Sequence, residues 1–284
     1  MKNVILLATA LVVGLLSYGQ SANRLFKKGV KAAAQGHYEQ AITIFTQVIQ
    51  QHPDLAEVWY NRALSASKLK QYRAAIEDYS KAIELKPAFP TAYLNRGADK
   101  NETGDREGAV ADYTKAIALR PAYGFAYYNR GIVFFQAKEY EKAMNDFSKA
   151  IEMEPAQAEA WYNRGMTKCK QEDYAGAIID FDRTLQLNPA YQKAYKNRGI
   201  AKSNLRQYAE AIQDYRKSLL LNPDDCQALN LLAIAGAHAT AGKDVLNDVG
   251  RAKELGCPVP ALLPGESYAR LHEQEKQHKD TLRR

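Results

Sequence analysis

The sequence predicts an all-α protein built as a solenoid of helical pairs, and three observations support this fold class. A 34-residue pattern returns in one register along most of the 284-residue chain, and a fixed period of this length is typical of repeat solenoids. Within each copy, large and small residues are spaced three and four apart, as on one face of a helix. A proline ends six copies, where it disfavours helix at the residue before it: Pro53, Pro87, Pro121, Pro155, Pro189 and Pro223.

Each copy contains two helical patterns separated by a short polar turn. The six clear copies span residues 22–55, 56–89, 90–123, 124–157, 158–191 and 192–225, and a degenerate pair without the aromatic residues spans 226–257. We number the residues of a repeat as places. A large residue stands at place 4, a small one at place 8, alanine at place 20 and an aromatic residue at place 24, as in Trp161, Gly165, Ala177 and Phe181. Small residues let two helices approach, and the aromatic ring fills the space beside them.

This pattern closely resembles the tetratricopeptide repeat (TPR) family, from roughly Ala22 to Cys257. The resemblance implies an α-α superhelix, right-handed, with six clear repeats and one degenerate helical pair. It also implies that the first helix of each pair lines a concave groove, which in this family usually holds a peptide or a segment of another protein.

The first 19 residues are interpreted as a signal peptide. Lys2 precedes an apolar run at Val4–Leu16, and Ser17-Tyr18-Gly19 provides small residues for cleavage before Gln20. The alternative is a membrane anchor, for which the run is short. We therefore expect export to the periplasm or the medium, without stable membrane insertion after cleavage. Four nearby cations argue against easy export: Arg24, Lys27, Lys28 and Lys31.

The two ends of the solenoid depart from the repeat pattern. The first helix of repeat one is rich in lysine and alanine, which suits a terminal repeat whose outer face meets water. Beyond the degenerate pair, residues 258–284 are expected to form a bend at Pro258, Pro260, Pro264 and Gly265 and then a polar C-terminal helix that covers the end of the stack.

The sequence contains no motif for catalysis or cofactor binding. None of the five histidines has a metal-ligand spacing, and a glycine-rich phosphate loop, a G-x-S-x-G turn and a CxxC pair are absent. We therefore expect no enzyme activity, no metal and no cofactor. The formal charge of +7 could suggest a nucleic acid partner, but no nucleic-acid-binding motif accompanies it, so nucleic acid is not expected.

Five repeats carry an arginine at place 7 and an aspartate at place 23. The arginine shares a face with residues that pack between helices, where a cation needs a carboxylate. Pairing within the repeat uses all five of each: Arg62 with Asp78, Arg96 with Asp112, Arg130 with Asp146, Arg164 with Asp180, and Arg198 with Asp214. Pairing with the following repeat is the alternative.

The resemblance to the family implies that places 2, 5, 6, 9, 12 and 13 of each first helix face the groove. The predicted groove residues are Tyr60, Asn61, Asn95, Phe125, Tyr128, Asn129, Phe135, Tyr162, Asn163, Met166, Lys170, Lys193, Lys196 and Asn197. Asparagine could hold a peptide backbone, or it could instead tie neighbouring helices together. Aromatic residues are densest in repeats four and five, where binding is expected to be centred, and the lysines suggest an acidic flank on the ligand. The family's lysine–asparagine clamp for chaperone tails is absent.

Cys226 and Cys257 begin and end the degenerate pair, so an antiparallel arrangement would bring them to the same pole. An oxidising compartment would permit a disulfide between them. The alternative is that all three cysteines are reduced, and in either case Cys169 is the odd thiol on the groove side.

These inferences predict an exported, non-catalytic protein–protein interaction scaffold that binds a peptide or protein segment in its groove. Two alternatives stay open, namely an accessory subunit of an enzyme or cell-envelope complex and a self-associating scaffold. The sequence leaves the oligomeric state undetermined.

Overall fold

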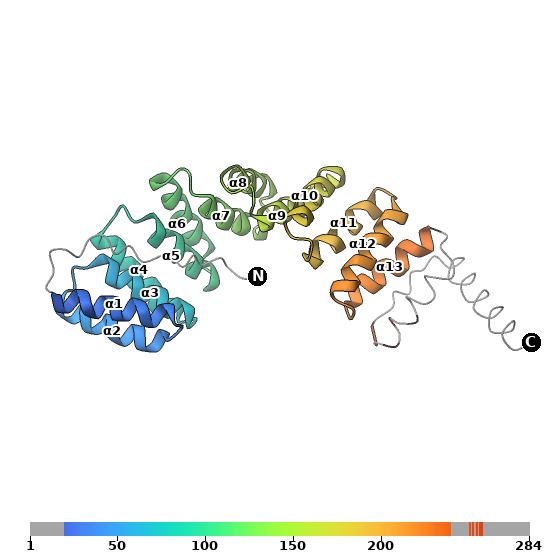
Figure 1. Ribbon diagram of the computed structural model, residues 1–284. Coiled ribbons are helices and arrows are strands. Elements are labelled where there is room, and N and C mark those ends of the chain that lie inside the picture. The colour runs from blue at the N-terminus through green and yellow to red at the C-terminus, as the bar shows by residue number, and fades with distance from the viewer. Residues whose placement is uncertain (1–19, 240–249, 251, 253, 255, 258–284) are drawn as a thin grey trace, which may run out of the picture. The chain divides into compact units, whose positions relative to one another are not determined.

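A computed structural model describes residues 20–239, 250, 252, 254, 256 and 257 of the chain. These residues are all-α, with thirteen helices and no strand among them (Figure 1). The predicted fold class, a solenoid of helical pairs, is thereby confirmed. The predicted signal peptide, the bend and polar helix of residues 258–284, and most of the second helix of the degenerate pair lie outside the described residues.

The helices alternate between first and second members of a pair. The first helices are α1 (Gln20–Ala34), α3 (Ala56–Lys68), α5 (Pro90–Glu102), α7 (Gly124–Gln136), α9 (Ala158–Lys170), α11 (Gln192–Asn204) and α13 (Cys226–His238). The second helices are α2 (Tyr38–Gln51), α4 (Tyr72–Leu85), α6 (Arg106–Leu119), α8 (Tyr140–Met153), α10 (Tyr174–Leu187) and α12 (Tyr208–Leu221). From α3 onward, every first helix begins at the first residue of a repeat.

A left-handed residue at place 15 turns the chain between the two helices of each clear repeat. The residues are Gly36, Lys70, Gly104, Lys138, Glu172 and Arg206, all with positive φ. After α9, the amide nitrogen of Asp173 donates to the carbonyl of Lys168 at 2.9 Å, and the amide of Glu172 donates to Cys169. These bonds satisfy the last carbonyls of the helix. Because four of the six turn residues are not glycine, the sequence does not mark this turn clearly.

The small residue at place 8 lies directly against the aromatic ring at place 24. At Gly199 a Cβ atom would lie 2.6 Å from Cε1 of Tyr215, whose side chain is fully buried. That separation is shorter than a carbon–carbon contact allows, so glycine permits the close approach of α11 and α12. The alanines at place 20, among them Ala177 and Ala211, are also fully buried.

Contacts divide the chain into two compact units, Met1–Glu154 and Pro155–Arg284, and each is described by itself. In the N-terminal unit, α1 contacts α3, α3 contacts α5, and α5 contacts α7, whereas no comparable contact joins the described second helices. In the C-terminal unit, α9 contacts α11 and α11 contacts α13. The first helices therefore form the inner face of each unit, which is the name used below.

A disulfide joins Cys226, at the start of α13, to Cys257, and their Cα atoms are 5.3 Å apart. The amide of Cys257 donates to the carbonyl of Ala252 at 2.9 Å. Ala252 and Cys257 are buried in one cluster with Tyr215 and Leu229. The bridge thus ties Cys257 to the start of α13 within the C-terminal unit.

Removing this bridge with the double change Cys226→Ser and Cys257→Ser is expected to destabilise the C-terminal unit by about 3 kcal/mol. The unfolded chain then regains the freedom of a closed loop with 31 residues of sequence separation. Urea unfolding with and without reductant measures the effect. Cys169→Ser is the control, because that thiol is free. Equal unfolding midpoints for the double variant and the oxidised wild type would contradict the prediction.

Candidate functional site

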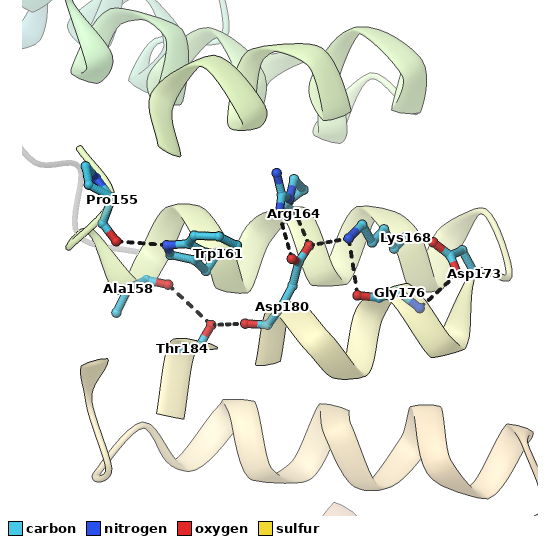
Figure 2. Close-up of polar contacts among 9 residues, drawn as sticks. All are labelled: Pro155, Ala158, Trp161, Arg164, Lys168, Asp173, Gly176, Asp180 and Thr184. Atoms are coloured by element: carbon cyan, nitrogen blue, oxygen red, sulfur yellow. Dashed lines mark hydrogen bonds and ion pairs between the residues drawn. The ribbon is translucent and has the colours of Figure 1, made fainter. Parts of the chain in front are cut away.

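The five arginine–aspartate pairs form within the repeats, as predicted. In Figure 2, Asp180 of α10 points between Arg164 and Lys168 of α9, and Nε and Nη2 of Arg164 donate to its two oxygens at 2.9 and 2.8 Å. The other four pairs are bidentate in the same way: Arg62 with Asp78, Arg96 with Asp112, Arg130 with Asp146, and Arg198 with Asp214. The hydrogen bond that Arg130 donates to Asp146 raises the pKa of Arg130.

The remaining guanidinium nitrogen links consecutive repeats, which sequence reasoning did not predict. In the N-terminal unit, Nη1 donates to a hydroxyl of the preceding repeat at place 25, and the three acceptors are Thr46, Ser80 and Thr114, at 3.0, 3.0 and 2.9 Å. In the C-terminal unit, Nη1 of Arg198 donates to Asp182 at 2.6 Å. The recurring hydroxyl at place 25 was the signal that could have indicated this contact.

A lysine adds a second cation to three of the aspartates. The pairs are Lys100 with Asp112, Lys168 with Asp180, and Lys202 with Asp214, at 2.9, 2.9 and 2.8 Å. In these three repeats, two cations share one buried carboxylate. The arginines and these lysines therefore stabilise the stack, and they are not available to bind a ligand.

The predicted groove tyrosines are part of the packing inside each unit. In the N-terminal unit, Tyr60 is buried against Tyr79 and Phe89, with ring centroids 5.7 and 4.8 Å away, and burial raises its pKa to about 12. Tyr128 is buried beside Phe147. An alanine at Tyr128 would thus remove a core contact, so its effect would report on stability as well as on binding.

In the C-terminal unit, Tyr162 is half-buried, with its ring centroid 5.8 Å from Phe181 and 4.9 Å from Tyr191. Burial raises its pKa to about 12. Tyr162 lies in one cluster with Met166 and Cys169, packed against Phe181. Burial also raises the pKa of the Cys169 thiol to about 11, so this cysteine stays protonated at neutral pH.

Two of the predicted groove asparagines, Asn95 and Asn197, tie neighbouring first helices together. Nδ2 of Asn95 donates to the hydroxyl of Tyr60 at 3.0 Å, and Nδ2 of Asn197 donates to that of Tyr162 at 2.8 Å. Asn61 donates to the carbonyl of Glu57 within its own helix at 2.7 Å. Both linking contacts join a tyrosine at place 5 of one repeat to an asparagine at place 6 of the next. This combination is visible in the sequence and could have indicated the contact.

The other predicted residues differ in how accessible they are. In the N-terminal unit, Asn129 is buried, and Phe125 and Phe135 are half-buried. In the C-terminal unit, Asn163 and Met166 are half-buried.

The three predicted lysines of the C-terminal unit have different surroundings. Lys170 and Lys193 are exposed, whereas Lys196 pairs with Asp225 at 2.8 Å, and only 15% of its side chain is exposed. Among the described residues, Lys170 and Lys193 thus make no ion pair, whereas Lys196 does.

The described residues contain neither a cluster suited to a metal ion nor a helix suited to spanning a membrane. Among them, no group of three histidine, cysteine or acidic side chains is placed to hold a metal ion. Of the thirteen helices, not one combines the length and the apolar character that crossing a membrane requires.

Comparison with known proteins gives the family and the fold. Family models described as tetratricopeptide repeat match residues 25–55, 56–89, 125–156, 158–191 and 193–225, and one described as TPR repeat matches 100–138. No curated protein matches the chain. Among solved structures, YrrB, described as a TPR protein with an unusual peptide-binding site, is 23% identical with a TM-score of 0.58 over 65% of this chain and 95% of that one.

Two further structures share the fold at 18% identity. A tetratricopeptide repeat protein from Parabacteroides merdae has a TM-score of 0.63 over 89% of this chain and 98% of that one. PilF of Pseudomonas aeruginosa has a TM-score of 0.64 over 72% of this chain and 92% of that one. Likeness at this level of identity shows the fold alone. The repeat matches extend over more than half of the sequence, and the chain therefore belongs to the tetratricopeptide repeat family, whose members are generally non-catalytic scaffolds that bind protein partners.

Proposed function

We propose that this protein is an exported, non-catalytic scaffold that binds a peptide segment of another protein on the inner face of its C-terminal unit. The observation that carries the proposal is a set of accessible apolar and amide side chains on α9 and α11 beside Lys170 and Lys193, which make no ion pair with the described residues. In the N-terminal unit, Tyr60, Leu94, Asn95, Tyr128 and Asn129 at places 5 and 6 are buried, whereas Asn61 at place 6 and Ile132 at place 9 are half-buried.

The side chains of α9 and α11 suit an extended peptide. Met166 and Ile200 are partly exposed and offer apolar contact to a ligand side chain. Asn197 uses its amide nitrogen twice, toward Tyr162 and toward the carbonyl of Lys193 at 3.0 Å. Its amide oxygen has no hydrogen bond to the described residues, so it can accept one from a peptide N–H.

The lysines favour an acidic flank on the peptide. Lys170 and Lys193 are exposed and make no ion pair within the part of the chain that the structure describes. The nearby Lys196 is neutralised by Asp225, so the positive charge open to a ligand is that of Lys170 and Lys193.

Two observations support export. The sequence begins with Lys2, the apolar run of residues 4–16 and small residues at positions 17 and 19. The disulfide between Cys226 and Cys257 suits an oxidising compartment, because disulfides are rare in the cytosol. N-terminal sequencing of the protein isolated from its native cell tests this step, and a chain that still begins at Met1 would contradict cleavage.

The double change Lys170→Glu and Lys193→Glu is expected to weaken binding of an acidic peptide about tenfold or more, because like charges then oppose one another. A peptide library screened on the full chain supplies the ligand, and titration of each variant gives the affinity. The matched control is Arg183→Glu with Lys217→Glu, which makes the same charge change at exposed positions of the second helices α10 and α12. Equal weakening by both pairs, or no weakening by the first, would rule out this face.

A further inference from the structure

Four cations line one exposed face of α1. They are Arg24, Lys27, Lys28 and Lys31, which follow the spacing i, i+3, i+4 and i+7 of a single helix face. All four are exposed, and none makes a hydrogen bond or ion pair with the described residues. Helix α1 contains no aspartate or glutamate. We call these four residues the basic face.

In later repeats, the positions of the basic face are packing positions. Place 3 of the following first helices in the N-terminal unit is Val58, Ala92 and Ala126, which are fully buried. Place 10 is Ser65, Asp99 and Val133, which are also buried. In α1 the same two places are Arg24 and Lys31. The basic face therefore lies where a preceding helical pair would stack, and its charges prevent such stacking.

The stability of the fold does not account for four like charges. Cations spaced three and four apart on a helix repel one another and destabilise it. A terminal face needs only polar side chains, and a mixture of charges would serve without this repulsion. At place 7, Lys28 replaces the arginine of later repeats, and its aspartate partner is absent because place 23 is the buried Ile44. The charges thus point to a negatively charged ligand.

We propose that the basic face binds the surface of an anionic phospholipid bilayer. Clustered lysine and arginine side chains are attracted to anionic headgroups, and the attraction acts within about one Debye length of the surface. In the sequence, only seven residues separate the end of the apolar run at residue 16 from Arg24. Until that run is cleaved, its insertion in a bilayer would hold the basic face near the headgroups. A nucleic acid ligand is less favoured, because the only aromatic residue of α1, Phe26, is buried and cannot stack on a base.

Vesicle binding by the full chain tests this proposal. The variant carries Arg24→Gln, Lys27→Gln, Lys28→Gln and Lys31→Gln. Its matched control removes four exposed cations elsewhere in the same unit, with Arg73→Gln, Arg106→Gln, Lys115→Gln and Lys138→Gln. All chains keep the same N-terminus, so any contribution of the apolar run cancels. Co-sedimentation is measured with phosphatidylcholine vesicles, with and without phosphatidylglycerol, at about 0.1 M and about 1 M salt, where the Debye length falls from about 10 to 3 Å.

The wild type is expected to bind the phosphatidylglycerol vesicles at low salt at least about tenfold more tightly than the basic-face variant, and the control is expected to lose less than about half of its binding. High salt should remove the difference between wild type and variant. Equal losses in the two variants would overturn the proposal, as would wild-type binding by the basic-face variant. Preferential binding of the wild type to an RNA oligonucleotide over the anionic vesicles would also overturn it and make nucleic acid the ligand.

Discussion

Replacing Asp180 with alanine is expected to destabilise the C-terminal unit by about 3–5 kcal/mol. The Asp180 side chain is fully buried and accepts hydrogen bonds from Arg164 on both oxygens, while Nζ of Lys168 lies 2.9 Å away (Figure 2). Its removal takes this buried carboxylate away from two cations that lie close together. Truncating one side of a buried ion pair is strongly destabilising, because the remaining charge is desolvated and unpaired.

Trp161 provides the measurement, because it lies on the same helix as Arg164, with the guanidinium carbon 4.8 Å from its ring. Trp59 is replaced by tyrosine, the residue at this place in three other repeats, so that fluorescence during urea unfolding reports on the C-terminal unit. Asp182→Ala is the control, since that side chain is 46% exposed and pairs with Arg198. The Asp182→Ala variant should lose less than about 1 kcal/mol of stability. Similar losses of stability in the Asp180 and Asp182 variants would refute the prediction.

Asp99→Asn is expected to make the N-terminal unit more stable at pH 8, by up to about 4 kcal/mol, and less dependent on pH. Asp99 is 1% exposed, Oδ1 accepts a hydrogen bond from Ser67 at 2.7 Å, and the buried Oδ2 has no partner among the described residues. Burial raises the pKa of this carboxyl from 3.8 to about 7, the negative charge of Glu102 adds to the rise, and the bond from Ser67 opposes it. Each unit of pKa difference corresponds to about 1.4 kcal/mol.

Whether stability rises or falls with pH depends on which state, folded or unfolded, holds the proton of Asp99. Between about pH 4 and pH 7, the folded chain keeps the proton of Asp99 while the unfolded chain has lost it, so stability falls as the pH rises. The stabilisation that comes from keeping Asp99 protonated in the folded chain is complete below about pH 4 and is lost by about pH 8. Unfolding followed at Trp59, with Trp161→Tyr, should show this decline in the wild type and not in the asparagine variant. Parallel pH profiles for the two chains would show that Asp99 ionises normally.

The sequence by itself determined the elements that depend only on the period. A fixed 34-residue register places the same residue at the same point of every helical pair, so one arginine–aspartate pair implies five. From α3 onward, the first helices begin at the repeat starts for the same reason. The sequence places Cys226 and Cys257 at the two ends of the degenerate pair, which an antiparallel arrangement is expected to bring together, and a disulfide joins them.

Only the tertiary structure decided which of these residues face solvent. Periodicity gives the direction of a side chain around its own helix, but burial depends on how closely the next helix packs. Tyr60 and Tyr128 are predicted groove residues and are nevertheless buried, because rings at place 24 lie against them. Asn95 and Asn197 bind a tyrosine of the preceding repeat, a contact set by the spacing between first helices. Asp99 has no counterpart in the other repeats, and its burial without a cation arises from packing between α3 and α5 that no repeating pattern encodes.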